Sequence, residues 1–177
     1  MSKKSKHPVD AASLPYRPCV GQMVINAAGH IWIGCRADSV NDAEGRGAWW
    51  QMPQGGIEDG EDPAAAAIRE LYEETNIRSV SLIAEHPRWV NYDLPPDLIG
   101  KAWGGRYRGQ KQKWFAFRFE GSDDEISIVP PPGSDAEFVS WRWAGIDELL
   151  DLIVPFKRDV YREVLKEFAS LARPAQT

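Results

Sequence analysis

The chain has 177 residues and a formal charge of −5, a length that suits one domain with a sizeable core. No apolar run is long enough to span a membrane, and the basic, polar segment 1–15 lacks the apolar core of a secretory signal. We therefore expect a cytoplasmic protein without a membrane partner, whose two cysteines, Cys19 and Cys35, are reduced core residues. A polyanionic substrate would need locally concentrated positive charge and metal.

The predicted organisation has three parts: a flexible N-terminal tail at 1–14, a single domain at 15–172 and a C-terminal tail at 173–177. The domain opens with a predicted hairpin, in which residues 16–25 form a strand, turn at an Asn-Ala-Ala-Gly sequence and continue into the alternating residues 30–35. The polar, glycine-containing residues 39–48 follow and are predicted to form a loop.

The segment 55–77 is predicted to contain a helix. Asp62 is a good N-cap, Pro63 suits the first helical position, and four alanines follow. The helix should end near Thr75, because Asn76 readily adopts the left-handed conformation of a C-terminal cap.

Two stripes of side chains run along this helix, which turns by about 100° per residue. The stripe predicted to pack on the core contains Ala64, Ala67, Ile68, Leu71 and Thr75. A second stripe, roughly 120° away, carries Glu70, Glu73 and Glu74. Like charges at this spacing each cost about 0.2–0.5 kcal/mol, so the stripe is either a solvated acidic face or a Mg²⁺ or Mn²⁺ site. The preceding Gly-rich loop favours the metal site, because glycine lets backbone approach a ligand closely.

The rest of the chain mixes strands and helices. Strands are predicted at 80–85, 88–92, 112–119 and 138–143, and helices at 147–152 and 159–171. Helices do not regularly separate these strands, which favours an α+β fold over a doubly wound parallel one. Between 101 and 119 the chain carries six basic residues and no acid, with aromatic residues interleaved. Such a stretch is commonly a solvated strand and loop, but its composition also favours a nucleic-acid or polyphosphate contact.

The segment 55–77 resembles the Nudix hydrolase box, G-x5-E-x7-R-E-U-x-E-E-x-G-U, where U is aliphatic. The matching positions are Gly55, Glu61, Arg69, Glu70, Leu71, Glu73, Glu74 and Ile77. Asn76 stands where the family has Gly, a mild change because Asn also tolerates the left-handed conformation. The resemblance implies an α/β/α sandwich with a central mixed sheet. It also implies a metal-dependent hydrolase of a nucleoside diphosphate linked to another group.

Further stretches resemble one branch of this family, the bacterial RNA 5′-pyrophosphohydrolases and the related diadenosine polyphosphate hydrolases. These stretches are YRP at 16–18, WWQMPQGG at 49–56, GQKQKWF at 109–115, EFVSWRW at 137–143 and FKRDVYREVLKEFAS at 156–170. Two departures stand out: Cys19 replaces a polar Asn, and residues 38–46 look like an insertion.

The resemblance implies roles for the acidic residues. Glu70, Glu73 and Glu74 would be metal ligands, and Glu137 would be a further ligand or the base for the attacking water. Glu73, Glu137 and Arg69 form the predicted catalytic set, with Arg69 orienting the ligand carboxylates. From the sequence alone, Glu137 is an ordinary exposed acid, and Arg69 pairs with Glu73 at helical spacing. Glu61 is expected to have a supporting structural role.

The predicted substrate contacts lie outside the helix. Arg17 and Lys157 would bind phosphate, and Phe156 and Tyr92 would stack on bases, although Arg17 could instead cap a strand and Phe156 could belong to the core. The remaining predicted contacts are Gln54, Gly55, Lys111 and Lys113. Residues 111 and 113 share one face of a strand because strand side chains alternate.

The function expected from this resemblance is hydrolysis of a phosphoanhydride with Mg²⁺ or Mn²⁺. The favoured substrate is 5′-triphosphorylated RNA, converted to a 5′-monophosphate end at the start of mRNA decay. The alternative is hydrolysis of diadenosine tetraphosphate and related dinucleoside polyphosphates. A third hypothesis is an RNA-binding module with a vestigial box, and the intact carboxylate set argues against it.

Overall fold

The computed structural model describes residues 10–39 and 49–174. Most of the predicted loop at 39–48 and of the possible insertion at 38–46 lies outside the described residues, as do most of the two predicted tails. Those predictions stay untested. The described part of the N-terminal segment includes a 3-10 turn, Ala11–Ser13, that is capped by the Asp10 side chain.

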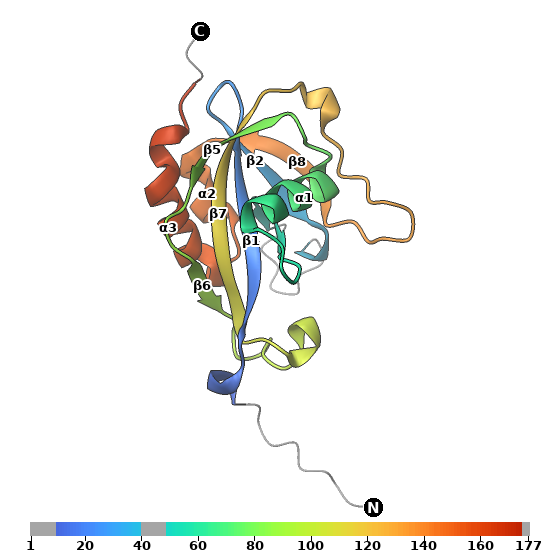
Figure 1. Ribbon diagram of the computed structural model, residues 1–177, viewed down its shortest axis with the longest axis vertical. Coiled ribbons are helices and arrows are strands. Elements are labelled where there is room, and N and C mark those ends of the chain that lie inside the picture. Colours follow the sequence, from blue (N-terminus) through green and yellow to red (C-terminus); the bar gives the residue numbers. More distant parts are fainter. Residues whose placement is uncertain (1–9, 40–48, 175–177) are drawn as a thin grey trace, which may run out of the picture.

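Eight strands in the described chain form one mixed sheet (Figure 1). They are β1 (Tyr16–Ile25), β2 (Ile31–Arg36), β3 (Trp50–Gln51), β4 (Gln54–Gly56), β5 (Val80–Glu85), β6 (Val90–Asp93), β7 (Gly109–Phe119) and β8 (Phe138–Ala144). The main path is β3-β2-β1-β7-β5, while β4 pairs with β1, β6 with β7 and β8 with β2. β1 and β7 run parallel along the whole of β1, and this ladder forms the centre of the sheet.

The predicted hairpin between β1 and β2 is confirmed, because the two strands are antiparallel neighbours in the sheet. The Asn26 side chain accepts hydrogen bonds from two backbone N–H groups of the turn, and Gly29 has a φ of 83°. Beyond the turn, the described pairing of β1 with β2 is limited to Ile25 and Ile31. β2 also pairs with β8, and β4 pairs with β1 further along the strand.

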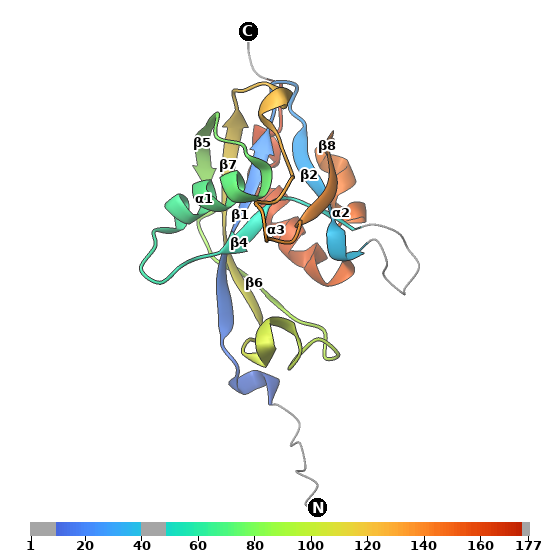
Figure 2. The same cartoon turned by 90° about the vertical axis from the view of Figure 1, so that its right-hand side faces the viewer.

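Helices cover both faces of the sheet (Figures 1 and 2). α1 (Pro63–Thr75) lies on one face, and α2 (Leu149–Leu152) and α3 (Arg158–Phe168) lie on the other. Side chains of β1 alternate between two apolar clusters, with Met23 on the α3 side and Val24 on the α1 side. The predicted α+β sandwich with a mixed central sheet is confirmed.

The ends of α1 agree with the sequence prediction. The Asp62 side chain accepts a hydrogen bond from the Ala65 N–H at 3.1 Å, and Asn76 is left-handed with a φ of 59°. The Asn76 side-chain amide also donates to the Glu125 carbonyl at 2.9 Å, a contact that glycine has no side chain to make. The departure from the Nudix pattern at this position is therefore structurally mild.

The buried face of α1 differs from the predicted stripe. Ile68 was expected in the core but is 49% exposed, and the buried residues are Ala66, Ala67, Leu71 and Thr75. At about 100° per residue, this set spans roughly half of the helix and includes the directions of Glu70 and Glu74. The predicted apolar and acidic stripes therefore overlap, because α1 packs its carboxylates against β4 as well as its apolar side chains against β1.

The predicted apolar stripe of the C-terminal helix is confirmed in α3, where Val160, Tyr161, Val164, Leu165 and Phe168 are buried. The Tyr161 hydroxyl accepts a hydrogen bond from the buried Met52 N–H at 2.8 Å. This bond ties α3 to the segment between β3 and β4. None of the helices in the described part of the chain has the length and apolar character needed to cross a lipid bilayer.

Tyr161→Phe should lower the free energy of unfolding by about 1–3 kcal/mol, because it leaves the buried Met52 N–H without an acceptor. Urea denaturation would measure the loss. Tyr72→Phe is the matched control, because that ring is 46% exposed and its hydroxyl has no hydrogen bond among the described residues. Equal stability of the two variants would contradict the prediction.

Candidate active site

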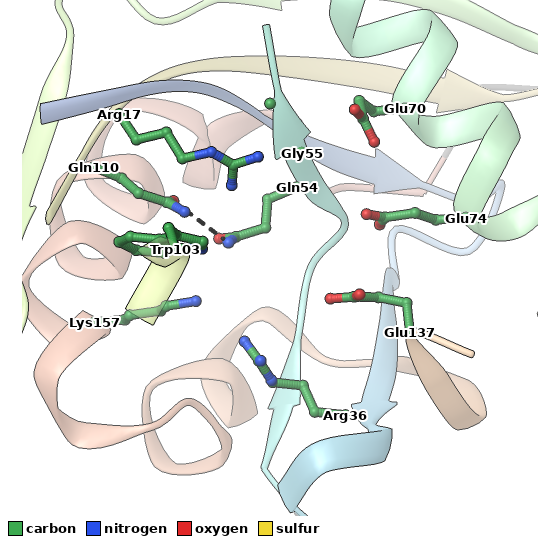
Figure 3. Close-up of a pocket in the computed structure, with 11 residues that line it drawn as sticks. Arg17, Arg36, Gln54, Gly55, Glu70, Glu74, Trp103, Gln110, Glu137 and Lys157 are labelled. Atoms are coloured by element: carbon green, nitrogen blue, oxygen red, sulfur yellow. Dashed lines mark hydrogen bonds between the residues drawn. The ribbon is translucent and has the colours of Figure 1, made fainter. Parts of the chain in front are cut away.

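A polar cavity of about 320 Å³ lies where α1, β1, β4 and the start of α3 meet. Its lining residues are Arg17, Arg36, Gln54, Gly55, Gly56, Glu70, Glu74, Trp103, Gln110, Glu137 and Lys157. Figure 3 shows that the carboxylates of Glu70, Glu74 and Glu137 point into the cavity from one side of β4. Arg17 and Lys157 approach the cavity from the other side, and Arg36 extends its guanidinium towards them from below Glu137 (Figure 3). We call the three carboxylates the acidic wall and these three cationic side chains the basic wall.

The acidic wall depends on Gly55, the central residue of β4. A Cβ atom at Gly55 would lie 2.1 Å from the Glu70 carboxyl carbon, so a side chain there would displace the carboxylate. The Glu74 Oε2 atom is buried and has no hydrogen-bond partner in the described chain. Burial, reinforced by Glu137 and Glu70, holds the pKa of Glu74 well above its ordinary value. Burial also raises the pKa of Glu70, although the neighbouring Arg69 opposes that shift.

Arg69 connects the helix to the loop before it. Its guanidinium contacts Glu61 at 2.7 and 2.9 Å, Glu70 at 3.0 Å and Glu73 at 3.3 Å, and it donates to the Gly56 carbonyl at 3.0 Å. The hydrogen bond to Arg69 lowers the pKa of Glu61 to about 2. Arg69 thus lies where the predicted orienting group would act, and Glu61 where a supporting residue would act.

Glu73 is placed differently from its two neighbours. Its side chain is 54% exposed and does not line the cavity. It lines an adjacent cleft of about 410 Å³, which Glu74 and Glu137 also line. The three predicted helix ligands therefore face two neighbouring spaces, with Glu74 and Glu137 bordering both.

The carboxylate oxygens of the acidic wall are suitable ligands for a hard divalent cation, but they are not arranged around a common metal position. No three His, Cys, Asp or Glu side chains within the described ranges are arranged to hold a metal ion. Arg69 occupies oxygens of Glu70 and Glu73, which accounts for part of this. The unpartnered Glu74 oxygen and the crowded carboxylates nevertheless form an uncompensated negative site, and carboxylate oxygens are the ligands that Mg²⁺ and Mn²⁺ prefer.

The basic wall contains Arg17, Arg36 and Lys157. Lys157 is 4% exposed, and its Nζ lies 5.6 Å from the centre of the Tyr92 ring. Burial, reinforced by the charge of Arg36, lowers the pKa of Lys157 to about 7. Arg36 pairs with Asp38 and donates to the Gln51 side chain at 3.2 Å.

A chain of glutamines orders the floor of the cavity. Gln112 Nε2 donates to Gln54 Oε1 at 3.1 Å and to Gln110 Oε1 at 2.8 Å, while its oxygen accepts from the Trp114 indole at 2.9 Å. These bonds fix the Gln54 side chain beside Gly55. Gln54 and Gly55 therefore lie in the cavity, as the sequence predicted for substrate contacts.

The other predicted substrate residues lie outside this cavity. Lys113 pairs with Glu85 at 3.3 Å, and the Lys111 Nζ lies 5.5 Å from the centre of the Trp89 ring. Phe156 lines a separate cavity of about 380 Å³ between the 95–98 and 154–156 segments. Tyr92 is 7% exposed, and its ring centre lies 5.8 Å from that of Phe156. The roles proposed for these four residues stay predictions.

Sequence reasoning missed Arg36, Trp103 and Gln110 as cavity residues. A signal existed for Gln110, because it alternates with Lys111 along β7 and so faces the opposite side of the sheet. Trp103 lies in the 101–119 stretch, whose basic and aromatic composition favoured a nucleic-acid or polyphosphate contact without singling out this residue. No signal marked Arg36, which reaches the cavity through the packing of distant segments. Both cysteines are free and buried as expected, and burial raises the pKa of Cys19 to about 11.

Comparison with known proteins agrees with this geometry. Residues 15–164 match the NUDIX domain. The chain belongs to the NUDIX domain family. RNA pyrophosphohydrolase from Mesorhizobium japonicum is 59% identical over 167 residues, which cover 93% of this chain and 96% of that protein. RNA pyrophosphohydrolase from Brucella anthropi is 59% identical over 170 residues, which cover 95% and 98%.

Solved structures of other Nudix proteins share the fold. The E. coli dihydroneopterin triphosphate pyrophosphohydrolase aligns with a TM-score of 0.62 at 19% identity, covering 86% of this chain and 99% of that one. A binary complex of the C. elegans Ap4A hydrolase aligns with a TM-score of 0.58 at 16% identity, covering 87% and 98%. At these identities the likeness supports the fold alone. Nudix hydrolases generally use divalent cations, which suits the carboxylates of the acidic wall.

In metal-free protein, Glu74→Gln should raise the free energy of unfolding at pH 8 by about 1 kcal/mol or more, because it removes a buried charge that desolvation and the neighbouring carboxylates disfavour. The pKa of Glu74 is raised in the folded state, so the unfolded chain loses its proton first and wild-type stability falls as pH rises above the unfolded value. The gain should therefore shrink towards pH 4. Urea denaturation with a chelator at both pH values is the measurement, and an equal gain at the two pH values would refute the assignment.

Lys157→Met should change how stability depends on pH. The pKa of Lys157 is lowered to about 7, so between pH 7 and its unfolded value the unfolded chain binds more protons. Wild-type stability from this group is fully present above that window and is lost as pH falls to about 7. At pH 7 the variant should be more stable than wild type by a few kcal/mol, a magnitude set by the lowering of the Lys157 pKa in the folded state. This advantage should be lost near pH 10. If the free energy of unfolding had the same pH dependence in the two proteins, the lowered pKa of Lys157 would be contradicted.

Proposed function

We propose that this protein is a metal-dependent Nudix hydrolase that removes pyrophosphate from 5′-triphosphorylated RNA and leaves a 5′-monophosphate end. Such a reaction would initiate mRNA decay, and it would take place in the cytoplasm. The single observation that carries the proposal is the cavity itself, in which a carboxylate wall faces three cationic side chains across a glycine-containing strand. The two relatives named RNA pyrophosphohydrolase support the choice of RNA, since each matches over nearly the whole chain.

The acidic wall would hold Mg²⁺ or Mn²⁺. Glu70, Glu74 and Glu137 line the cavity, and Glu73 joins them from the adjacent cleft once its contact with Arg69 is exchanged. When bound, the cation would neutralise the carboxylates, polarise the phosphate oxygens and lower the pKa of the attacking water. Arg69 would continue to orient the ligands from the loop side through Glu61.

The reaction is a displacement by water at phosphorus. A water molecule forms the new P–O bond, the anhydride bond to the leaving phosphate breaks, and pyrophosphate departs with the electron pair of that bond. Glu137 or Glu73 would accept the proton of the attacking water, as both border the cleft beside Glu74. Arg17, Arg36 and Lys157 would offset the phosphate charge, and a guanidinium suits this because its donors are planar and paired.

The nucleoside part would lie beyond the phosphate cavity. Phe156 lines a second cavity and neighbours the buried Tyr92, which supports the proposal that Phe156 would stack on a base with Tyr92 packed behind it. Stacking of this kind is worth about 1–3 kcal/mol per base. Lys111 and Lys113 would contact RNA further from its 5′ end.

The alternative activity is hydrolysis of diadenosine tetraphosphate. The same cavity would accept its phosphate chain, but the structural likeness to an Ap4A hydrolase is at 16% identity and supports only the fold. Turnover of triphosphorylated RNA and of diadenosine tetraphosphate should therefore be compared with Mg²⁺ on one enzyme preparation. We expect the higher kcat/KM for RNA, and a higher value for the dinucleotide would reassign the substrate.

Glu73→Gln should lower kcat by about 100-fold or more with an unchanged circular dichroism spectrum, since it removes a predicted ligand on an exposed part of α1. Glu167→Gln on the exposed side of α3 is the matched control and should leave kcat unchanged. Metal-dependent turnover retained by Glu73→Gln would count against this mechanism. RNA binding by wild type without any turnover of either substrate would favour a binding module.

A further inference from the structure

The segment between β6 and β7 brings an aromatic ring to the basic wall. Residues 101–108, here called the basic strap, include the 3-10 turn Ala102–Gly105, which lies at the end of the sheet where β1 begins (Figures 1 and 2). Trp103 from this turn lines the phosphate cavity together with Arg17 (Figure 3). The Arg17 guanidinium carbon lies 5.7 Å from the centre of the Trp103 ring.

Arg17 has few other contacts that fix its position. Across residues 10–39 and 49–174 it makes no salt bridge and no side-chain hydrogen bond, whereas Arg69 makes both. Gly56 on β4 leaves room for the guanidinium, because a Cβ atom there would lie 2.8 Å from Arg17 Nη2. The charge of Glu70 across the cavity also attracts the guanidinium, but that attraction acts without a hydrogen bond. The contact with the indole face is the short-range one that can orient the guanidinium.

The backbone of the basic strap is shaped to present Trp103. Trp103 has a φ of 50°, a left-handed conformation that is uncommon for a bulky residue. Gly100, Gly104 and Gly105 also have positive φ, and a Cβ atom at Gly105 would lie 2.9 Å from the Gly100 carbonyl oxygen. The glycines make the tight turn sterically possible, and the turn brings the indole beside Arg17.

We propose that Trp103 is a positioning residue, which holds the Arg17 guanidinium by a cation–π contact in the orientation that meets the substrate triphosphate. The inference rests on the proposed function for the identity of the substrate. The basic strap would thus contribute to phosphate binding through Trp103. Its cationic residues Lys101, Arg106 and Arg108 do not line the cavity.

A double-mutant cycle between Trp103 and Arg17 tests this coupling. Trp103→Asn is the suitable truncation, because Asn tolerates the left-handed backbone that the turn requires. Trp103→Asn should raise KM for triphosphorylated RNA by about 3- to 10-fold with kcat nearly unchanged, and Trp103→Phe should recover most of the loss. In an Arg17→Ala background, Trp103→Asn should have no further effect on KM.

Additive effects of the two substitutions would overturn the inference. They would mean that Trp103 acts independently of Arg17, for example by stacking on a base. Tyr107→Ala is the control for the strap, because the Arg106 guanidinium lies at the same 5.7 Å from that ring and neither residue lines the cavity. The Tyr107 ring also packs edge-on against Trp103, so an effect that acts through Trp103 should disappear in the Arg17→Ala background. A KM increase for Tyr107→Ala that persists in that background would show a general disturbance of the strap and would also overturn the inference.

Binding of inorganic triphosphate, measured by calorimetry without added metal, separates this inference from the proposed function. Trp103→Asn and Arg17→Ala should each weaken binding, and the double variant should bind no more weakly than Arg17→Ala alone. If wild type fails to hydrolyse triphosphorylated RNA but shows this pattern, the proposed function fails and the positioning role stands. If Trp103→Asn binds triphosphate as tightly as wild type does, the positioning role fails whatever the enzyme hydrolyses.

Discussion

The site depends on one cluster of charges around Arg69. This guanidinium contacts three carboxylates and a backbone carbonyl, and so joins α1 to the loop that follows β4. Without it, Glu70 and Glu73 would repel each other on the surface of the helix, and the loop would lose its contact through Glu61. Arg69 does not reach Glu74, whose Oε2 atom has no hydrogen-bond partner in the described chain. The residual negative charge is what a divalent cation would neutralise.

The basic wall has a different physical origin. Its members come from β1, from the end of β2 and from the turn before α3, which are far apart in the chain. The parallel ladder of β1 and β7 brings the first of these beside the basic strap, since Tyr16 pairs with Gly109. The glutamines of β7 then fill the cavity floor with donors and acceptors that are satisfied among themselves. Charge of both signs is thus concentrated in one place although the chain as a whole is acidic.

The match between prediction and structure varies with the range of the interactions involved. Asp62 and Asn76 were predictable as helix ends because their effects are local. The position of Ile68 was not, because a helix with a carboxylate-bearing face can pack in more than one rotation and only the contacts with β1 and β4 select one. The predicted pairing of β2 with β1 is confirmed, but its second pairing with β8 was not predictable, because it joins segments that lie more than 100 residues apart in the chain.

The sequence by itself determined the α+β class, the ends and length of α1, and the spacing of the carboxylates that marks the Nudix family. These properties follow from periodicity, capping and motif spacing, which act within a few residues. Only the tertiary structure decided that Glu70 and Glu74 line the cavity while Glu73 lines the adjacent cleft. It also decided that Lys111 and Lys113 lie outside the cavity. It also brought Arg36, Gln110 and Trp103 to the cavity. The physical reason is that burial and charge at a site depend on the packing of segments that no local pattern in the chain relates to one another.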